Sequence, residues 1–209
     1  MIRRLLPWAI VAFLLAVAFF VGTAFWRASQ LPEDLTASVT DTVDAPVEAV
    51  WMVLNTSGVL TERFDEVEFE EVTEDAQGLV SWTARHEDRN YFTRFERTRA
   101  EQPQGGAQWV YAYSITPEEV PVMTAREVLM LDKGNGVTQV TVTDTMKITN
   151  RQMRMWMGVL GIDSGAKNEL KAILALADAA EAAGAAEASR SGPFGLHGAP
   201  MRRSMPDAS

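Results

Sequence analysis

The pattern of hydrophobic and polar positions is most informative around residues 41–54, DTVDAPVEAVWMVL. Thr and Val alternate with other residues over Thr36–Val43, which predicts a strand. Pro46 follows, and its fixed φ suits the first turn of a helix. Apolar residues then recur at i, i+3, i+4 and i+7, on one helix face: Val47, Val50, Trp51 and Leu54. The chain therefore passes from a strand straight into a short amphipathic helix, which Asn55–Gly58 ends.

Six further segments have the composition of strands, and most of the links between them are short and turn-like. The exception is the longer link Thr116–Met123, which contains two prolines. Such spacing predicts consecutive antiparallel hairpins. The predicted strands are Glu66–Glu74, Leu79–His86, Tyr91–Ala100, Gln108–Ile115, Ala125–Leu131 and Val137–Ile148.

A helical period returns over Gln152–Ala183, where apolar residues again share one face. Gly158, Gly161 and Gly165 interrupt its first part and predict a kink or a break. The tail, residues 185–209, is rich in Ala, Gly, Ser and Pro, and we expect it to be disordered.

The first segment is apolar without a polar face. Leu5–Trp26 is 22 residues without a charge, which as a helix would extend roughly 33 Å. Its length predicts a membrane-spanning anchor within residues 1–27, with a cleaved secretion signal as the alternative. Arg3 and Arg4 precede the segment, so the positive-inside rule predicts a single-pass protein with a cytoplasmic N-terminus and an exported domain.

Composition narrows the possible functions. The chain has 209 residues and a formal net charge of −9. Between Leu31 and Ala183 it carries 26 Asp and Glu against 13 Lys and Arg, so this acidic zone disfavours nucleic-acid binding. Cysteine is absent and there are only two His, His86 and His197, so the sequence predicts no thiol nucleophile, no His-rich metal site and no cofactor.

The order of elements resembles the START/Bet v1-like (SRPBCC) superfamily, in particular its bacterial polyketide cyclase/dehydrase branch. The resemblance rests on VDAPVEAVWMVL at Val43–Leu54, on the six strands, and on KNELKAILALADAAEA at Lys167–Ala182. It implies an α+β helix-grip fold over residues 28–184, with a curved antiparallel seven-stranded sheet around a long C-terminal helix. It also implies a hydrophobic cavity between sheet and helix. The stretch SGVLTERFDEV departs from the family, because it lacks the expected Trp and Pro.

Strand and helix periods define which side chains can share such a cavity. Aromatic and methionine side chains suit an adaptable apolar pocket, although an ordinary packed core uses the same residues. Asp144 interrupts an apolar face; it is either buried with Arg97, Tyr111 or Tyr113 as a partner, or turned outward by a bulge, which we favour. The predicted ligand-binding residues are Trp82, Tyr111, Tyr113, Asp144, Met146, Met153, Trp156 and Met157.

These features predict a membrane-anchored binding protein for a hydrophobic small molecule or lipid. One alternative is a cyclase/dehydratase-type enzyme that uses Asp144, His86 or a tyrosine as acid or base. The other is a membrane-tethered module that binds a protein partner. The sequence contains no nucleophile-elbow, phosphate-loop or zinc-protease motif that would decide between these three functions.

Overall fold

The computed structural model of the chain describes residues 2–64, 67–86, 91–102, 108–118 and 122–190. The helices and strands follow one another in the order α1 (Ile2–Ala28), β1 (Asp34–Val43), α2 (Val47–Asn55), η1 (Ser57–Val59), α3 (Leu60–Arg63), β2 (Val67–Asp75), β3 (Gly78–His86), β4 (Tyr91–Glu101), β5 (Gln108–Pro117), β6 (Val122–Asp132), β7 (Thr138–Ile148), α4 (Arg151–Leu160) and α5 (Ser164–Arg190).

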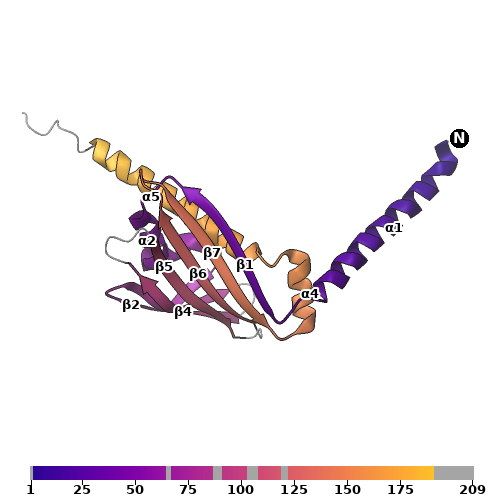
Figure 1. Cartoon of the computed structure of the whole chain (residues 1–209), viewed down its shortest axis with the longest axis horizontal. Helices are drawn as coiled ribbons and strands as arrows, with labels where there is room; N and C mark the ends of the chain where they lie inside the picture. Colours follow the sequence, from indigo (N-terminus) through magenta and orange to yellow (C-terminus); the bar gives the residue numbers. More distant parts are fainter. Residues whose placement is uncertain (1, 65–66, 87–90, 103–107, 119–121, 191–209) are drawn as a thin grey trace, which may run out of the picture.

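The strands form one antiparallel sheet in the order β1-β7-β6-β5-β4-β3-β2. Strands β2 to β7 pair as successive hairpins, and β1 joins the edge beside β7, far from its neighbour in sequence. Helix α5 crosses one face of this sheet and contacts α2, β1 and β7 (Figure 1). The α+β arrangement and the seven-stranded sheet agree with the prediction from the sequence.

The alternation along β7 decides which side chains face α5. Every second residue from Thr138 to Ile148 is buried, and the register with β1 and β6 runs without a bulge. The larger core cluster lies between this face of the sheet and the helices α2 and α5. A second, smaller cluster lies around Leu35, Met146 and Ile148, near the start of β1.

The predicted break in the C-terminal helix lies at Gly161. Its φ of 99° lies in the left-handed region, and its N–H donates to the Met157 carbonyl to end α4. Asn150 begins α4 by accepting hydrogen bonds from the Gln152 and Met153 N–H groups. Helix α5 then continues to Arg190, so residues 185–190 of the predicted tail are helical, and the rest of the tail lies outside the described residues.

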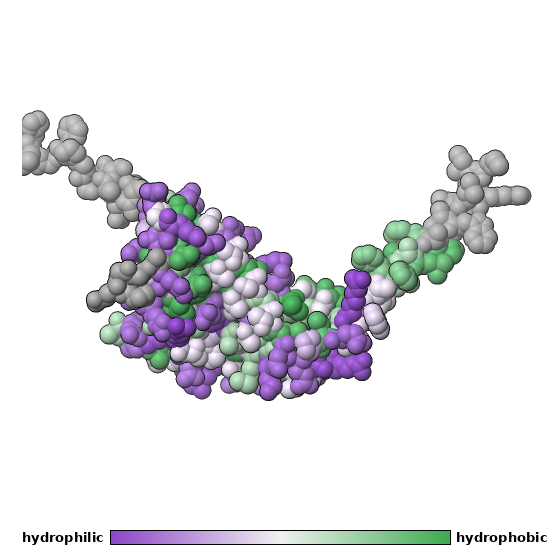
Figure 2. All heavy atoms as spheres, in the orientation of Figure 1, coloured by the Kyte–Doolittle hydropathy of each residue, from purple (hydrophilic) through white to green (hydrophobic). Residues whose placement is uncertain are grey.

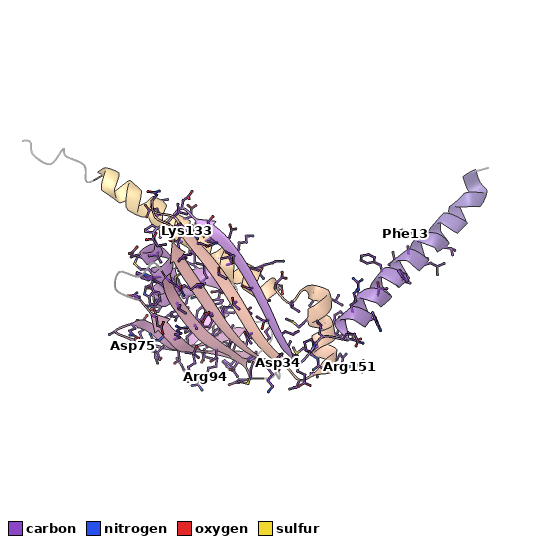
Figure 3. All side chains as sticks on the ribbon, viewed as in Figure 1. Phe13, Asp34, Asp75, Arg94, Lys133 and Arg151 are labelled. Carbon is purple, nitrogen blue, oxygen red and sulfur yellow. The ribbon has the colours of Figure 1, made fainter. Side chains whose placement is uncertain are left out.

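Helix α1 meets the rest of the fold at its C-terminal end. Its last turn packs on α4: the Phe25 and Trp156 rings meet edge to face at 5.6 Å, and Ala28 lies against Gly158. Helix α1 extends away from the sheet, and Phe13 and other apolar side chains along it are exposed (Figures 2 and 3).

No helix among the residues that the structure describes combines the length and the apolar composition needed to cross a membrane. This finding contradicts the predicted membrane-spanning helix over Leu5–Trp26, and with it the predicted anchor and single-pass location.

Candidate ligand-binding cleft

Four charged side chains meet in the interior between the sheet and α5. Arg63 comes from α3, Arg126 from β6, Asp144 from β7 and Glu169 from α5, and they are 5%, 7%, 2% and 4% exposed. Buried charges are costly unless they are paired and hydrogen-bonded. We call these four residues the charged cluster.

Arg126 and Asp144 form a two-pronged ion pair. They lie directly opposite each other in the β6–β7 register. The Arg126 Nε donates to Asp144 Oδ1 at 2.6 Å, and Nη2 donates to Oδ2 at 2.7 Å. Arg126 Nη1 also donates to Glu169 Oε2 at 3.2 Å. Such bidentate pairs fix both the position and the orientation of the guanidinium.

Arg63 connects the short helix α3 to three other elements. Its Nε donates to Glu169 Oε1 at 2.7 Å, its Nη1 to the Leu54 carbonyl at 3.1 Å and its Nη2 to the Tyr113 hydroxyl at 2.9 Å. Nη2 is also ion-paired with Glu169 Oε1. The Tyr113 hydroxyl in turn donates to Glu169 Oε1 at 3.1 Å. Glu169 therefore serves both arginines at once.

The surrounding charges set the protonation of Glu169 and Tyr113. Burial by itself would raise the pKa of Glu169, but Arg63 and Arg126 outweigh it and hold that pKa below its ordinary value. Burial, together with the Glu169 charge, raises the pKa of the Tyr113 hydroxyl. Glu169 is thus held ionised between its two arginines, and the adjoining Tyr113 hydroxyl is held neutral.

A cleft of about 610 Å³ opens over this cluster, between α3, the start of β2 and α5. Gly165 borders it, and a Cβ at Gly165 would lie 3.2 Å from Arg126 Nη2 and 3.3 Å from Asp144 Oδ2. The lining residues are Glu62, Arg63, Phe64, Val67, Arg126, Gly165, Asn168, Glu169, Lys171, Ala172, Ala175 and Leu176.

A second cleft of about 390 Å³ adjoins the first, since both are lined by Glu62 and Leu176. It lies between α2 and the middle of α5, and its walls are almost entirely apolar. Besides the two shared residues, it is lined by Ala49, Met52, Val53, Thr56, Val59, Ala179 and Ala180. We call the two together the α5 groove, with a charged end at Arg126 and an apolar end at Ala180.

Three of the predicted ligand-binding residues form a packed aromatic core. Trp82 stacks on Phe95 with centroids 5.1 Å apart, and also contacts Tyr113. Tyr111 contacts both Tyr113 and Trp51. Trp82, Tyr111 and Tyr113 are fully buried, and none of them lines the α5 groove. Tyr113 reaches the charged cluster through its hydroxyl.

Asp144 is buried rather than turned outward. The favoured explanation by a bulge was wrong, because the register of β7 is continuous on both sides and Asp144 faces inward with Val142 and Met146. Its partner is Arg126, which was not among the expected candidates.

The remaining predicted residues lie apart from the groove. Met146 belongs to the smaller core cluster, and Met153 and Met157 of α4 pack against that cluster. Trp156 is 49% exposed and contacts Phe25. His86 ends β3, but its side chain lies outside the described part.

Sequence reasoning missed Arg63, Arg126, Gly165 and Glu169. Arg126 carried a signal, because it shares a strand face with Val128 and Met130 and so interrupts an apolar face as Asp144 does. Among the described side chains, the structure shows no cluster of three or more His, Cys, Asp or Glu arranged to hold a metal ion.

Comparisons with known proteins identify the fold. No family model matches the chain, and no curated protein matches it. A norcoclaurine synthase of Thalictrum flavum has a TM-score of 0.53 at 10% identity, covering 69% of this chain and 94% of that one. A hypothetical protein of Helicobacter pylori has a TM-score of 0.50 at 8% identity, covering 70% and 86%.

The Zhui aromatase/cyclase of Streptomyces sp. R1128 has a TM-score of 0.49 at 20% identity, covering 69% of this chain and 94% of that one. At these identities the likeness concerns the fold alone. The fold expected from the resemblance to the START/Bet v1-like superfamily is thereby confirmed.

Proposed function

We propose that this protein binds an apolar small molecule in the α5 groove. The observation that carries the proposal is the joining of two clefts along one helix, one with apolar walls and one with buried polar groups at its floor. Each has a volume within the ~300–1,000 Å³ typical of small-molecule sites, and an apolar surface with a few fixed polar groups is their usual chemistry.

The hydrophobic effect supplies the driving force at the apolar end. Covering apolar surface contributes about 25 cal/mol per Å² removed from water. Met52, Val53 and Val59 offer such surface on one wall, and Leu176 with Ala179 on the other. Within the same fold, the norcoclaurine synthase is recorded in complex with a transition-state analogue, so this scaffold accommodates a small molecule in at least one relative.

The charged cluster favours a binding role over the cyclase/dehydratase-type alternative. General acid–base catalysis works best with a group whose pKa lies near the working pH. Here the pKa of Glu169 is lowered and that of Tyr113 is raised, so each is held away from neutrality. Both Asp144 oxygens are also occupied by Arg126. Glu169 and Tyr113 are therefore each held in one protonation state.

The test is a titration of the full chain with the fluorescent apolar probe N-phenyl-1-naphthylamine. Ala179→Trp fills the apolar end, whereas Ala182→Trp places the same side chain at an exposed position outside the lining. We expect Ala179→Trp to weaken probe binding about tenfold, the effect of losing ~1.4 kcal/mol, and Ala182→Trp to leave it unchanged. Any binding to the exposed α1 residues is common to both variants. Equal affinity in the two variants would place the probe elsewhere and refute the proposal.

A further inference from the structure

We propose that another cleft, next to the α5 groove but chemically distinct from it, binds an organic ammonium ion that carries an apolar chain. This cleft has a volume of about 550 Å³ and lies between the end of α2, the β2–β3 hairpin and the end of β4. We call it the hairpin cleft. Its two open acceptors belong to Glu74 and Asn55, and neither residue lines the α5 groove, so the inference does not rest on the proposed function.

The hairpin cleft is held open by contacts between α2 and the hairpin. The Asn55 Nδ2 donates to the Gln77 carbonyl, and the Ser57 N–H donates to Glu74 Oε1 at 3.0 Å. Gly78 has a φ of 97°, and a Cβ there would overlap the Asn55 amide. Only glycine therefore allows the turn to approach α2 this closely. The walls of the cleft are fixed before any ligand arrives.

The two acidic residues of the cleft differ in what they already bind. Asp75, at the tip of the hairpin (Figure 3), accepts from Arg97 Nη1 and Nη2 at 3.1 and 2.5 Å and from the Gln77 N–H at 2.7 Å. Among the described residues, Glu74 accepts only the Ser57 N–H, through Oε1, and has no ion-pair partner. No Lys, Arg or His of the described part lines the cleft. Arg97 balances Asp75, so Glu74 leaves one uncompensated negative charge.

A second acceptor in the wall is also unpaired. Asn55 Oδ1 is buried and accepts no hydrogen bond from the described residues, and such an acceptor is costly to leave unsatisfied. The open groups, Glu74 Oε2 and Asn55 Oδ1, are thus both acceptors, and one is ionised. A primary ammonium complements them, because it has three N–H donors and a positive charge. A ligand carboxylate would be repelled by Glu74, and a hydroxyl offers one donor without a charge.

Apolar surface lies beside these acceptors. Trp51 and Met52 line the cleft from α2. The Trp51 ring is fixed by edge-to-face contacts with Trp109 at 5.5 Å and Tyr111 at 5.8 Å. Met52 is 57% exposed, and a flexible thioether adapts to chains of different shape. This surface favours an ammonium with an apolar chain over a bare inorganic cation.

The experiment compares n-hexylammonium with 1-hexanol, an uncharged molecule of equal chain length, by isothermal titration calorimetry of the full chain at pH 7. We expect hexylammonium to bind about fivefold more tightly, the effect of ~1 kcal/mol from a charge-assisted hydrogen bond. Glu74→Gln keeps the shape and should abolish this preference. Glu68→Gln removes the same charge from an exposed position of β2 outside the lining and should retain it.

Two results would overturn the inference. One is equal affinity of the wild-type chain for hexylammonium and hexanol. The other is an equal loss of preference in Glu74→Gln and Glu68→Gln, which would reveal only diffuse attraction to an acidic surface. The wild-type comparison needs no variant, so a misfolded Glu74→Gln would not leave the inference untested.

The titration with N-phenyl-1-naphthylamine tests the α5 groove independently of the hairpin cleft. Hexylammonium binding without probe binding would refute the proposed function alone. Probe binding without a preference for hexylammonium would refute this inference alone.

Discussion

The space between the sheet and α5 has two regions that are filled by opposite chemistry. In the aromatic core, Trp82, Phe95 and Tyr111 pack ring against ring around Tyr113. In the charged cluster, two arginines and two carboxylates exchange hydrogen bonds. The α5 groove opens over the charged cluster, whereas the described clefts along α5 do not reach the three core rings Trp82, Phe95 and Tyr111.

One face of helix α5 contributes to both regions. Glu169 and Ile173 are four residues apart on α5, so they lie on the same face, and both are buried. Ile173 packs in the apolar core, where shape and volume determine the energy. Glu169 instead holds two arginines from other elements. A hydrogen-bonded network of this kind is rigid, so its polar groups keep one position beside the cleft.

The largest expected effect is the removal of the Glu169 carboxylate. Glu169→Ala leaves Arg63 and Arg126 buried with less counter-charge, which should lower the free energy of unfolding by about 3–5 kcal/mol. Ile173→Val, its counterpart in the apolar region, deletes one methylene and should cost only about 0.5–1.5 kcal/mol. Urea denaturation followed by circular dichroism measures both.

Glu181→Ala is the control for Glu169→Ala, because Glu181 is exposed on the same helix. Its unfolding free energy should stay within about 0.5 kcal/mol of the wild-type value. If Glu169→Ala were no more costly than Ile173→Val, the ionic contacts would contribute little and the distinction between the two regions would be wrong.

The sheet was accessible from the sequence because it depends on local periodicity, whereas Trp82, Tyr111 and Tyr113 were predicted to bind a ligand and instead pack as an aromatic core. The alternation in Val137–Ile148 predicts its inward face, and the turn-rich links predict the hairpins. Gly158, Gly161 and Gly165 predict the break between α4 and α5. The membrane span predicted from the apolar composition of Leu5–Trp26 was wrong, since no helix among the described residues is long and apolar enough to cross a membrane.

The charged cluster was only partly accessible. Arg126 and Asp144 each interrupt an apolar strand face, and adjacent antiparallel strands can place two such residues opposite each other. Considering both interruptions together would have identified the pair. Arg63 and Glu169 lie 106 positions apart, and no local period relates a short helix to a distant one. Their contact is a consequence of the tertiary fold.

Lowering the pH should reduce the free energy of unfolding by less than deletion of the Glu169 carboxylate does. The folded-state pKa of Glu169 lies below its ordinary value, so its contribution to stability is fully present above the unfolded pKa of about 4.3 and is lost as the pH falls through the folded-state pKa. Protonation preserves the volume of the side chain, which limits the loss. Unfolding free energies from pH 7 to pH 3 should therefore fall more steeply in the wild type than in Glu169→Gln.

The lowered pKa values of Asp75, Glu101 and Asp163 provide the background for that measurement. The pKa values of these carboxyls are shifted in the same direction, but the three groups are present in both proteins, so their contributions cancel in the difference. Identical pH dependence in the two proteins would mean that Glu169 is not held ionised by its arginines.

The smallest expected effect is the difference in unfolding free energy between two tyrosine variants at the boundary of the two regions. Tyr113→Phe removes the hydroxyl that accepts from Arg63 and donates to Glu169, at 2.9 and 3.1 Å, and should cost about 1–3 kcal/mol because buried partners are left unsatisfied. Tyr111→Phe removes a hydroxyl whose bond to the Leu79 carbonyl is 3.4 Å long, so it should cost under about 1 kcal/mol. Both rings remain in place, so the packing is matched and chemical denaturation of the two variants isolates the hydroxyls. Equal costs would show that the hydroxyl of Tyr113 belongs energetically to the aromatic core, and that the charged cluster consists of its four ionised side chains alone.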